Sequence, residues 1–309
     1  MPHSCHRRAA VHPLAGTPLA ARRSAIERGT IALATLLCLP SLATNLPAAD
    51  ADPRTFRVET EVFDDDDAKK PVARSLTLFR DGVAWDFLEA VPKKKGEQAA
   101  VEPVEFVLHD PARERIILVD PSRNVRTQID SLRLERLRAS LAAWARKSDD
   151  AVLRWAGSPD FSGGMTEESG KVVLVGPRVR YAVDYDEAAE EGAAEEYRKF
   201  ADAAVLVKAL VHPGGLPPFP RIAINRRVAA ARGIPSSVRL EVEPRLGRLA
   251  GRGTVLRSEH RIVPSWVAAD HKRVASAEER IALAEEVDLT TYAGKPIPGA
   301  DAAAESSRR

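Results

Sequence analysis

The stretch that decides the fold is EFVLHDPARERIILVDPSRNVRTQI, residues 105–129. Proline fixes φ at the value needed by the second residue of a tight turn, and a preceding aspartate can accept a hydrogen bond from the turn backbone. Asp110-Pro111 and Asp120-Pro121 therefore each predict a strand reversal. The three runs of aliphatic residues that they separate predict an antiparallel meander: Val104–His109, Arg115–Asp120 and Arg123–Ile129.

Three more strands are expected before the meander. Thr55–Phe63 alternates apolar and charged residues, which is typical of a strand with one wet face. The runs Val72–Arg80 and Val83–Ala90 are joined by Asp81-Gly82, a dipeptide that tolerates the positive φ of a two-residue hairpin turn. The loop at Asp64–Asp67 lacks the interleaved spacing of a calcium site and is predicted to be a solvated hairpin tip.

After the meander, the spacing of apolar residues changes from every second residue to every third or fourth residue. From Ser131, the apolar residues Leu134, Leu137, Leu141 and Trp144 predict a helix with one buried face. After this helix we expect two strands at residues 171–175 and 178–185, followed by two helices at 193–210 and 222–232. Two more strands are expected at 237–243 and 254–263. A last helix is expected at 276–287, opened by the capping box Ser276–Glu279.

These patterns predict an α+β fold, in which an antiparallel β meander is followed by helices that cover a face of the sheet. We expect a signal peptide over residues 1–51, a single domain over 52–295 and a disordered tail over 296–309. The leader has a basic segment ending at Arg28, the apolar stretch Ile31–Ala43 and small residues suited to signal peptidase. Arg22-Arg23 resembles a twin-arginine signal, but Ala25 replaces the usual bulky residue, so the ordinary secretory route is favoured.

Because the leader predicts export, we expect the mature protein in the periplasm or cell envelope, with no transmembrane anchor once the signal peptide is cleaved. Both cysteines, Cys5 and Cys38, lie in the leader, so the mature chain is expected to be free of cysteine. The formal net charge of +2 comes from the arginines of the leader, and the rest is nearly balanced. No global attraction to nucleic acid follows from that balance, while peripheral membrane contact stays open.

No motif for a metal or an organic cofactor is recognisable, and we expect neither. The histidines of the mature chain lack the spacing of a two-histidine metal face on a helix. His260, Asp270 and His271, together with Ser265, supply the residue types of a hydrolase triad. No nucleophile elbow or oxyanion loop accompanies them, because Pro213 in the segment His212–Gly215 has no amide to donate. Catalysis is therefore the less favoured alternative.

Arginines are concentrated late in the chain. Residues 221–257 contain nine arginines but only two acidic residues, Glu241 and Glu243, whereas residues 184–202 are strongly acidic. Pairing of the two regions within the fold is the favoured interpretation. The alternative is an anion-binding face for lipid headgroups or cell-wall polymers. The arginines are Arg221, Arg226, Arg227, Arg232, Arg239, Arg245, Arg248, Arg252 and Arg257.

The strand-turn-strand units of Glu105–Ile129, followed directly by the helix at Leu132–Lys147, resemble the bacterial lipoprotein-carrier (LolA/LolB-like) superfamily. The chain is also similar to uncharacterised exported bacterial proteins with a segment like Pro217-Pro218-Phe219-Pro220-Arg221 before a short helix. The resemblance implies that the domain over residues 52–295 is a curved, unclosed half-barrel, with a concave sheet that is lined by apolar side chains and roofed by helices. The residues expected to line it are Trp85, Phe87, Phe106, Leu118, Val125, Leu137, Leu141 and Trp144. The same residues would equally form a filled core.

Three functions follow as hypotheses. The first is an exported, non-catalytic binding protein for a lipid or acyl chain, a lipoprotein or another apolar ligand. The second is a structural or protein-interaction module of the envelope with a filled core. The third is a hydrolase that uses His260, Asp270 and His271.

Overall fold

The computed structural model describes residues 54–65, 68–89, 91, 103–212, 215–243 and 254–294, all within the unit Ala51–Arg309. The expected leader and tail lie outside the described residues. So do Asp66, Asp67, residues 90 and 92–102, Pro213, Gly214 and the arginine-rich residues 244–253.

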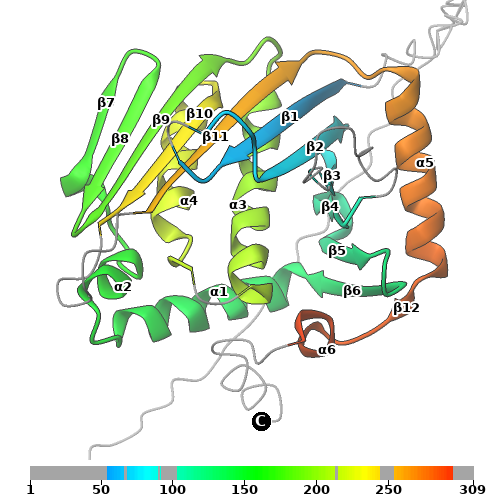
Figure 1. Cartoon of the computed structure of the whole chain (residues 1–309), viewed down its shortest axis with the longest axis horizontal. Helices are drawn as coiled ribbons and strands as arrows, with labels where there is room; N and C mark the ends of the chain where they lie inside the picture. The colour runs from blue at the N-terminus through cyan, green and yellow to red at the C-terminus, as the bar shows by residue number, and fades with distance from the viewer. Residues whose placement is uncertain are drawn as a thin grey trace, which may run out of the picture. The chain divides into compact units, whose positions relative to one another are not determined.

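Twelve strands among the described residues form one sheet (Figure 1) in the order β12-β6-β5-β4-β3-β2-β1-β11-β10-β9-β8-β7. Neighbouring strands are antiparallel except for β12 and β6. The first and last strands of this order are not paired, so the sheet is unclosed, as the resemblance implies. The strands are β1 (Thr55–Phe63), β2 (Ala73–Arg80), β3 (Val83–Glu89), β4 (Glu105–Asp110), β5 (Arg115–Asp120), β6 (Val125–Asp130), β7 (Met165–Glu168), β8 (Lys171–Gly176), β9 (Val179–Glu187), β10 (Gly233–Val242), β11 (Thr254–Val263) and β12 (Glu285–Glu286).

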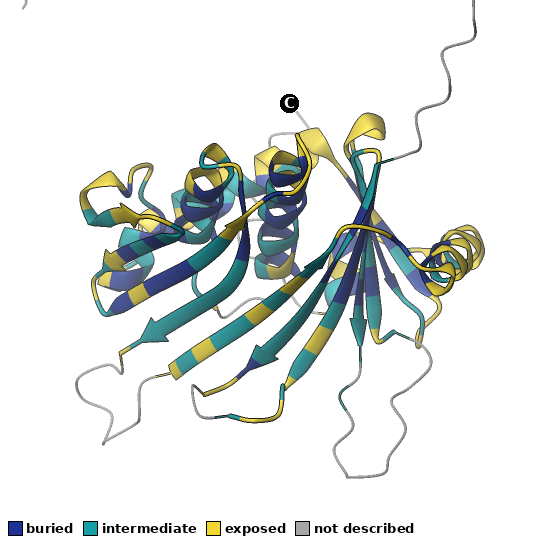
Figure 2. Ribbon diagram, turned by 90° about the horizontal axis from the view of Figure 1, so that it is seen from above, coloured by how far each residue is buried: buried dark blue, intermediate teal, exposed yellow. Residues whose placement is uncertain are grey.

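The described residues form six α-helices, which cover the two faces of the sheet unequally. We call the face that carries Phe56 and Val58 the inner face, and the face that carries Arg57 and Glu59 the outer face. Helices α1 to α4 and α6 contribute to the inner side, whereas α5 packs on the outer face (Figure 2). The helices are α1 (Ser131–Arg146), α2 (Ala151–Ala156), α3 (Ala193–Val211), α4 (Phe219–Ala230), α5 (Ala268–Leu283) and α6 (Leu289–Ala293).

The turns of the meander form as their residues predict. Asp81 and Gly82 both have positive φ, 52° and 80°, as a two-residue hairpin turn requires. The Asp110 carboxylate accepts from the Arg113 amide at 3.2 Å, and Asp120 accepts from the Ser122 amide at 2.9 Å. Asp130 caps α1 by accepting from the Arg133 amide at 2.7 Å. The meander therefore leads directly into a capped helix.

Apolar packing fills both sides of the sheet. On the inner side, α3 runs behind the strands, where Tyr197 and Phe200 pack against Phe56 and Phe79. A second inner cluster joins β5 and β6 to α1, α3 and α6, and a third joins β8 and β9 to α2 and α4. The outer cluster joins β2 to β5 to the inward side of α5. The sheet is thus the middle layer of a three-layer arrangement over β2 to β5 only.

Several boundaries differ from the prediction. The last long helix begins at Ala268 instead of Ser276, so the supposed capping box lies inside α5. Helix α4 begins at Phe219, because a proline in a first turn lacks only an amide that would be unpaired there anyway. Strand β10 begins at Gly233, not Ser237. β7, β12 and α6 have no clear signal in the sequence.

Candidate functional site

The residues expected to line one cavity lie on both faces of the sheet. Register explains this: Phe106 is opposite Val119 and Phe87, so it shares their outer face. Leu118, one residue from Val119, points to the inner face because successive side chains alternate. Trp85, Phe87 and Phe106 belong to the outer cluster under α5, and Leu118, Val125, Leu137 and Leu141 belong to the inner cluster under α1. The prediction of a single lining is therefore wrong.

Trp144 also departs from the prediction. It is 45% exposed, whereas Leu137 and Leu141 on the same helix are each 3% exposed. An amphipathic helix buries one face, and on α1 that face consists of Leu137, Leu141 and Ala145. Ala145 therefore occupies the buried position that the apolar spacing had predicted for Trp144. The seven other residues are tightly packed, which is the arrangement of a filled core and not of an open lining.

An irregularity in β10 opens the sheet elsewhere. Pro235 pairs with Tyr185 and Ser237 with Asp184, so Ser236 is an extra residue without a partner on β9. Such a bulge bends its strand. The pairing of β10 with β11 begins only at Ser237, and residues 260–263 of β11 pair with β1 alone. The two strands therefore diverge beside the N-terminal end of α3.

A cavity of about 420 Å³ occupies this divergence. Its walls are mainly apolar, with Phe56 from β1, Ile234 from β10, Ile262 from β11 and Ala193 from α3. His260 forms part of its boundary, and the acidic residues Asp186, Glu187 and Glu190 lie along it. Sequence reasoning missed this site, because nothing in the local pattern of β10 marks Ser236 as unpaired.

His260 is held by two hydroxyl groups. The Thr60 Oγ1 atom lies 3.0 Å from Nδ1, and the Ser258 Oγ atom lies 3.0 Å from Nε2. Thr60 is the cross-strand neighbour of His260, and Ser258 precedes it by two residues on the same strand. Burial, aided by the positive charge of Arg221, lowers the pKa of His260 to about 3. The imidazole is therefore neutral at physiological pH.

Arg221 lies in the first turn of α4, which packs against α3 and over β8 to β10. Its positive charge opposes the rise that burial causes in the pKa of Tyr181 on β9 and Tyr197 on α3, and it adds to the lowering of the pKa of His260 on β11. The Arg221 Nη1 atom is buried and has no hydrogen-bond partner. Among the described residues, no carboxylate is paired with it. Burial lowers the pKa of Arg221, yet a guanidinium stays protonated in proteins.

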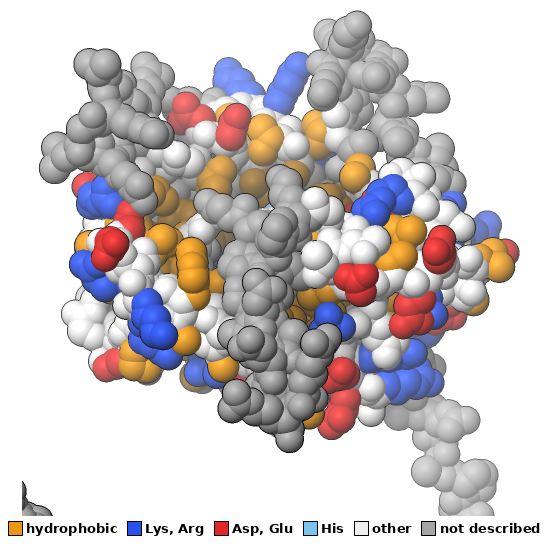
Figure 3. Space-filling view, turned by 90° about the horizontal axis from the view of Figure 1, so that it is seen from below, with side chains coloured by type: hydrophobic (Ala, Val, Ile, Leu, Met, Phe, Trp, Pro, Cys, Tyr) orange, Lys and Arg blue, Asp and Glu red, His pale blue; other side chains and the backbone are white. Residues whose placement is uncertain are grey.

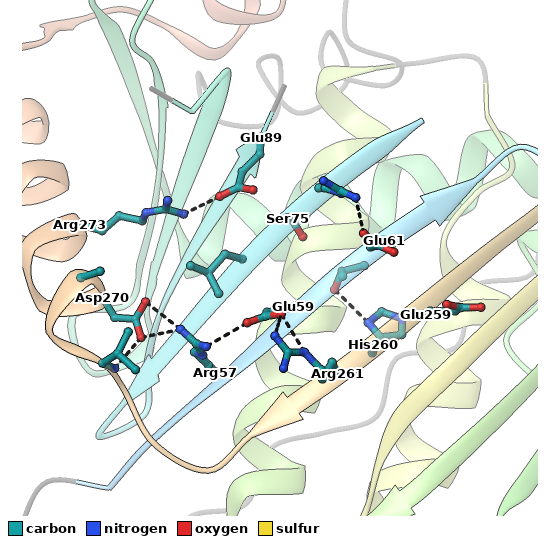
Figure 4. Close-up of a pocket in the computed structure, with 15 residues that line it drawn as sticks. Arg57, Glu59, Glu61, Ser75, Glu89, Glu259, His260, Arg261, Asp270 and Arg273 are labelled. Atoms are coloured by element: carbon teal, nitrogen blue, oxygen red, sulfur yellow. Dashed lines mark hydrogen bonds and ion pairs between the residues drawn. The ribbon is translucent and has the colours of Figure 1, made fainter. Parts of the chain in front are cut away.

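The outer face holds a larger groove of about 780 Å³ beside α5 (Figure 4). Its charged side chains are joined to one another in ion pairs, as the dashed lines in the figure show. Arg74 contacts Glu61 at 2.7 Å, and Arg273 contacts Glu89 at 2.6 Å. Glu59 accepts from Arg261 and also pairs with Arg57 at 3.0 Å. His260 and Arg261 border both this groove and the inner cavity.

The residues of the supposed hydrolase triad do not converge. His260 shares the inner face with Thr60, whereas Asp270 on α5 pairs with Arg57 on the outer face. The His271 ring packs against Trp266, with ring centroids 5.1 Å apart, and Ser265 is exposed in the turn before α5. Alternation along β1 and β11 separates the two faces, so this combination cannot act as a triad.

Three of the late arginines form ion pairs with glutamates on strands, and none of these three pairs involves the acidic segment 184–202. Arg239 pairs with Glu241, Arg257 with Glu259, and Arg227 with Glu167 at 3.3 Å. Arg245, Arg248 and Arg252 lie outside the described residues. Charges of both signs are interspersed around the edges of the face in Figure 3, with hydrophobic side chains between them.

The part of the chain that the structure describes contains no group of three or more histidine, cysteine, aspartate or glutamate residues arranged to hold a metal ion. Nor do its helices include one that is both long and apolar enough to cross a membrane. In comparisons with known proteins, no family model matches the chain, and no curated protein does.

Proposed function

We propose that this protein is a non-catalytic binding protein of the cell envelope that holds an apolar ligand between its sheet and α3. The cavity beside the bulge of β10 carries the proposal. At about 420 Å³ it has the size of a small-molecule pocket, and apolar side chains with a few polar groups form its walls, as in most such pockets. The ligand site is therefore proposed here and not among the residues that the resemblance implied.

The chemistry around His260 favours binding over catalysis. Ser258 and His260 are in hydrogen-bond contact, as a nucleophile and its base would be. A base whose conjugate acid has a pKa of about 3 accepts a proton poorly near neutral pH, because an efficient base has a pKa near the working pH. The other ring nitrogen meets Thr60, and a hydroxyl group does not stabilise an imidazolium as a carboxylate does.

A second candidate is a protein-interaction module of the envelope. The packing of seven of the eight expected lining residues favours it, since a filled core leaves recognition to the surface. The outer groove would be the surface concerned. The two candidate functions differ in the result expected with an apolar probe: an interaction module with a filled core would not bind such a probe in its cavity.

Uptake of an apolar fluorophore by the purified protein tests the first candidate. Ala189 lies exposed at the boundary of the cavity, so Ala189→Trp should obstruct it with little effect on folding. Ala112, exposed in the turn between β4 and β5, gives the matched control Ala112→Trp. We expect Ala189→Trp to weaken uptake at least about tenfold and Ala112→Trp to leave it unchanged. Failure of the unsubstituted protein to bind would favour the interaction module.

The envelope location rests on the N-terminal sequence and needs its own test. We expect cells that make the full chain to release a shortened form with the periplasmic fraction. Mass spectrometry of that form identifies the new N-terminus, which we expect within residues 44–52. Full-length protein retained inside the cell would contradict export. The same spectra report any acyl-containing compound that co-purifies.

A further inference from the structure

We infer that the groove between α1 and α4 is a second ligand site, which takes a small amphiphile with a carboxylate or phosphate headgroup. The groove has a volume of about 370 Å³, and residues of α1, of α4 and of the loop after α2 line it. This is the size of a small-molecule pocket. None of its lining residues belongs to the cavity beside β10, so the inference goes beyond the proposed function.

Each of the two helices gives one of its faces to the groove. The lining residues of α1 and those of α4 recur at intervals of i, i+3, i+4 and i+7, which places each set on one side of its helix. The face that α1 buries in the core is a different one, formed by Leu137, Leu141 and Ala145. The lining residues are Glu135, Arg138, Ala139, Ala142 and Arg146 on α1, and Phe219, Ile222, Ala223 and Arg226 on α4.

The bottom of the groove is apolar. Phe161 and Ile222 line the groove although they are only 7% and 6% exposed, so they lie deep in it. Ala139, Ala142 and Ala223 also line it, and their short side chains leave room between the two helices. An alkyl chain bound there would be removed from water, which is favourable in proportion to the apolar surface that it buries.

The charged residues that line the groove do not balance. They are three arginines and one glutamate, which sum to +2. Arg138 pairs with Glu135 at 3.4 Å. Arg146 donates to the carbonyl oxygen of Gly157 at 3.3 Å, and this uncharged group does not neutralise it. Among the described residues, Arg226 has no hydrogen bond or ion pair. Two positive charges of the groove therefore have no counterion in the described part of the chain.

An acidic residue near the groove does not supply the missing counterion. The charge of Arg226 acts on Asp202 of α3, but Asp202 does not line the groove. Its carboxylate already accepts from Arg198 Nη1 at 2.8 Å and from Asn225 Nδ2 at 2.9 Å. An anion that enters the groove would thus meet no unpaired carboxylate along the lining that the structure describes.

The apolar bottom and the cationic edges together determine the class of ligand. Arg146 and Arg226 are both exposed, so they lie at the edges of the groove, one on each helix. A carboxylate or phosphate accepts charge-assisted hydrogen bonds from guanidinium groups, and these are stronger than bonds between neutral groups. An inorganic anion would use only the edges and a hydrocarbon only the bottom, whereas an anionic amphiphile uses both.

The size of the groove favours a small molecule over a protein partner. A pocket of this volume encloses one small ligand, whereas a stable protein interface buries roughly 1,200–2,000 Å² of surface. The headgroup chemistry is shared by free fatty acids and by alkyl phosphates. Both are therefore included among the probes.

The experiment measures the binding of four probes to the purified full chain: decanoate, decyl phosphate, decanol and acetate. We expect one or both anionic amphiphiles to bind at least about tenfold more tightly than decanol and than acetate. The tighter of the two identifies the headgroup. The double variant Arg146→Gln/Arg226→Gln removes two exposed charges and should abolish the preference over decanol.

The matched control is the double variant Arg154→Gln/Arg227→Gln, which should retain that preference. It removes the same charge from exposed positions on α2 and α4 that do not line the groove. Like Arg146, Arg154 donates to a backbone carbonyl oxygen, that of Ser148, at 2.8 Å. A preference that survives in Arg146→Gln/Arg226→Gln, or that is lost equally in the control, would overturn the inference.

Obstruction of each site separates this inference from the proposed function. Ala139 is exposed in the groove, so Ala139→Trp should weaken binding of the anionic amphiphile at least about tenfold. Ala189→Trp, beside β10, should leave that binding unchanged. Loss in Ala189→Trp alone would overturn the groove site and support the cavity. Loss in Ala139→Trp alone supports the groove site, even if no apolar probe enters the cavity.

Three further results would also overturn the inference. Equal binding of decanol and the two anions would mean that the arginines do not recognise a headgroup. Acetate that binds as tightly as decanoate would mean that the apolar bottom contributes nothing. Sedimentation with vesicles that contain phosphatidylglycerol, without binding of the dispersed probes, would indicate a lipid surface as the partner instead of a small molecule.

Discussion

Arg57 on β1 and Asp270 on α5 form an ion pair between residues 213 positions apart, with Arg57 Nη1 3.1 Å from Asp270 Oδ2. The Asp270 side chain is almost completely buried, and the same Oδ2 atom accepts from the Val267 amide at 2.8 Å. One carboxylate thus satisfies the start of α5 and fixes that helix to the outer face.

Replacement of this carboxylate should be costly. We expect Asp270→Ala to lower the free energy of unfolding by about 3 kcal/mol, because it leaves Arg57 without its buried partner and α5 without a cap. Asp288 caps α6 from an exposed position, so Asp288→Ala should cost only about 1 kcal/mol. Urea denaturation measures both. Equal effects would contradict the special role of the Arg57–Asp270 pair.

Helix α1 offers a test of which residues form the core. Leu137→Ala should lower the free energy of unfolding by about 2–5 kcal/mol, since a fully packed leucine leaves a void. Trp144→Ala should cost less than about 1 kcal/mol, because the ring is 45% exposed. Thermal unfolding of the two variants distinguishes this arrangement from one in which Trp144 is buried. A large loss in Trp144→Ala would refute it.

Substitution by alanine should affect stability very differently at two adjacent glycines. A Cβ at Gly164 would overlap the carbonyl oxygen of Val175, whereas a Cβ at Gly163 would meet no atom within 4 Å. We expect Gly164→Ala to destabilise the protein by about 1–3 kcal/mol, because backbone must move to relieve the overlap. Gly163→Ala should be nearly neutral. Chemical denaturation measures the free energy of unfolding of both variants, and Gly163→Ala serves as the control for Gly164→Ala.

The neutral state of His260 predicts a pH dependence of stability. An unfolded histidine has a pKa near 6.5, but in the fold the pKa of His260 is about 3. Between these values the unfolded chain binds a proton that the folded chain does not, so stability falls as the pH decreases below 6.5. His109, whose pKa burial lowers to about 4, contributes in the same direction.

The size of this dependence can be measured with one variant. Between pH 6.5 and 5, we expect His260 to contribute a loss of about 1–2 kcal/mol. His260→Gln keeps groups able to bond Thr60 and Ser258, yet does not titrate. Its free energy of unfolding should therefore fall less steeply over that range than that of the unsubstituted protein. Parallel curves would show that His260 is protonated in the folded state.

The sequence determined the elements that depend on neighbours along the chain. Alternation over Thr55–Phe63, the turn at Asp81-Gly82, the two Asp-Pro reversals and the capped helix after Asp130 were all predicted, because each is stabilised within a few residues. Repetition of these local signals was enough to predict an antiparallel sheet with helices, and the resemblance to the lipoprotein carriers added that the sheet is unclosed. The arginine-rich region was also visible, although the buried, unbonded Nη1 atom of Arg221 was not.

Only the tertiary structure decided which residues meet. The pairing of β1 with β11 joins segments about 200 residues apart and has no local signal. Strand register assigned Phe106 and Leu118 to opposite faces, and it separated His260 from Asp270 in the same way. The cavity beside Ser236 and the unpaired state of Arg221 likewise arise where strands and helices from distant parts of the chain come together. Register and burial depend on these long-range contacts, whereas propensity and turn chemistry do not.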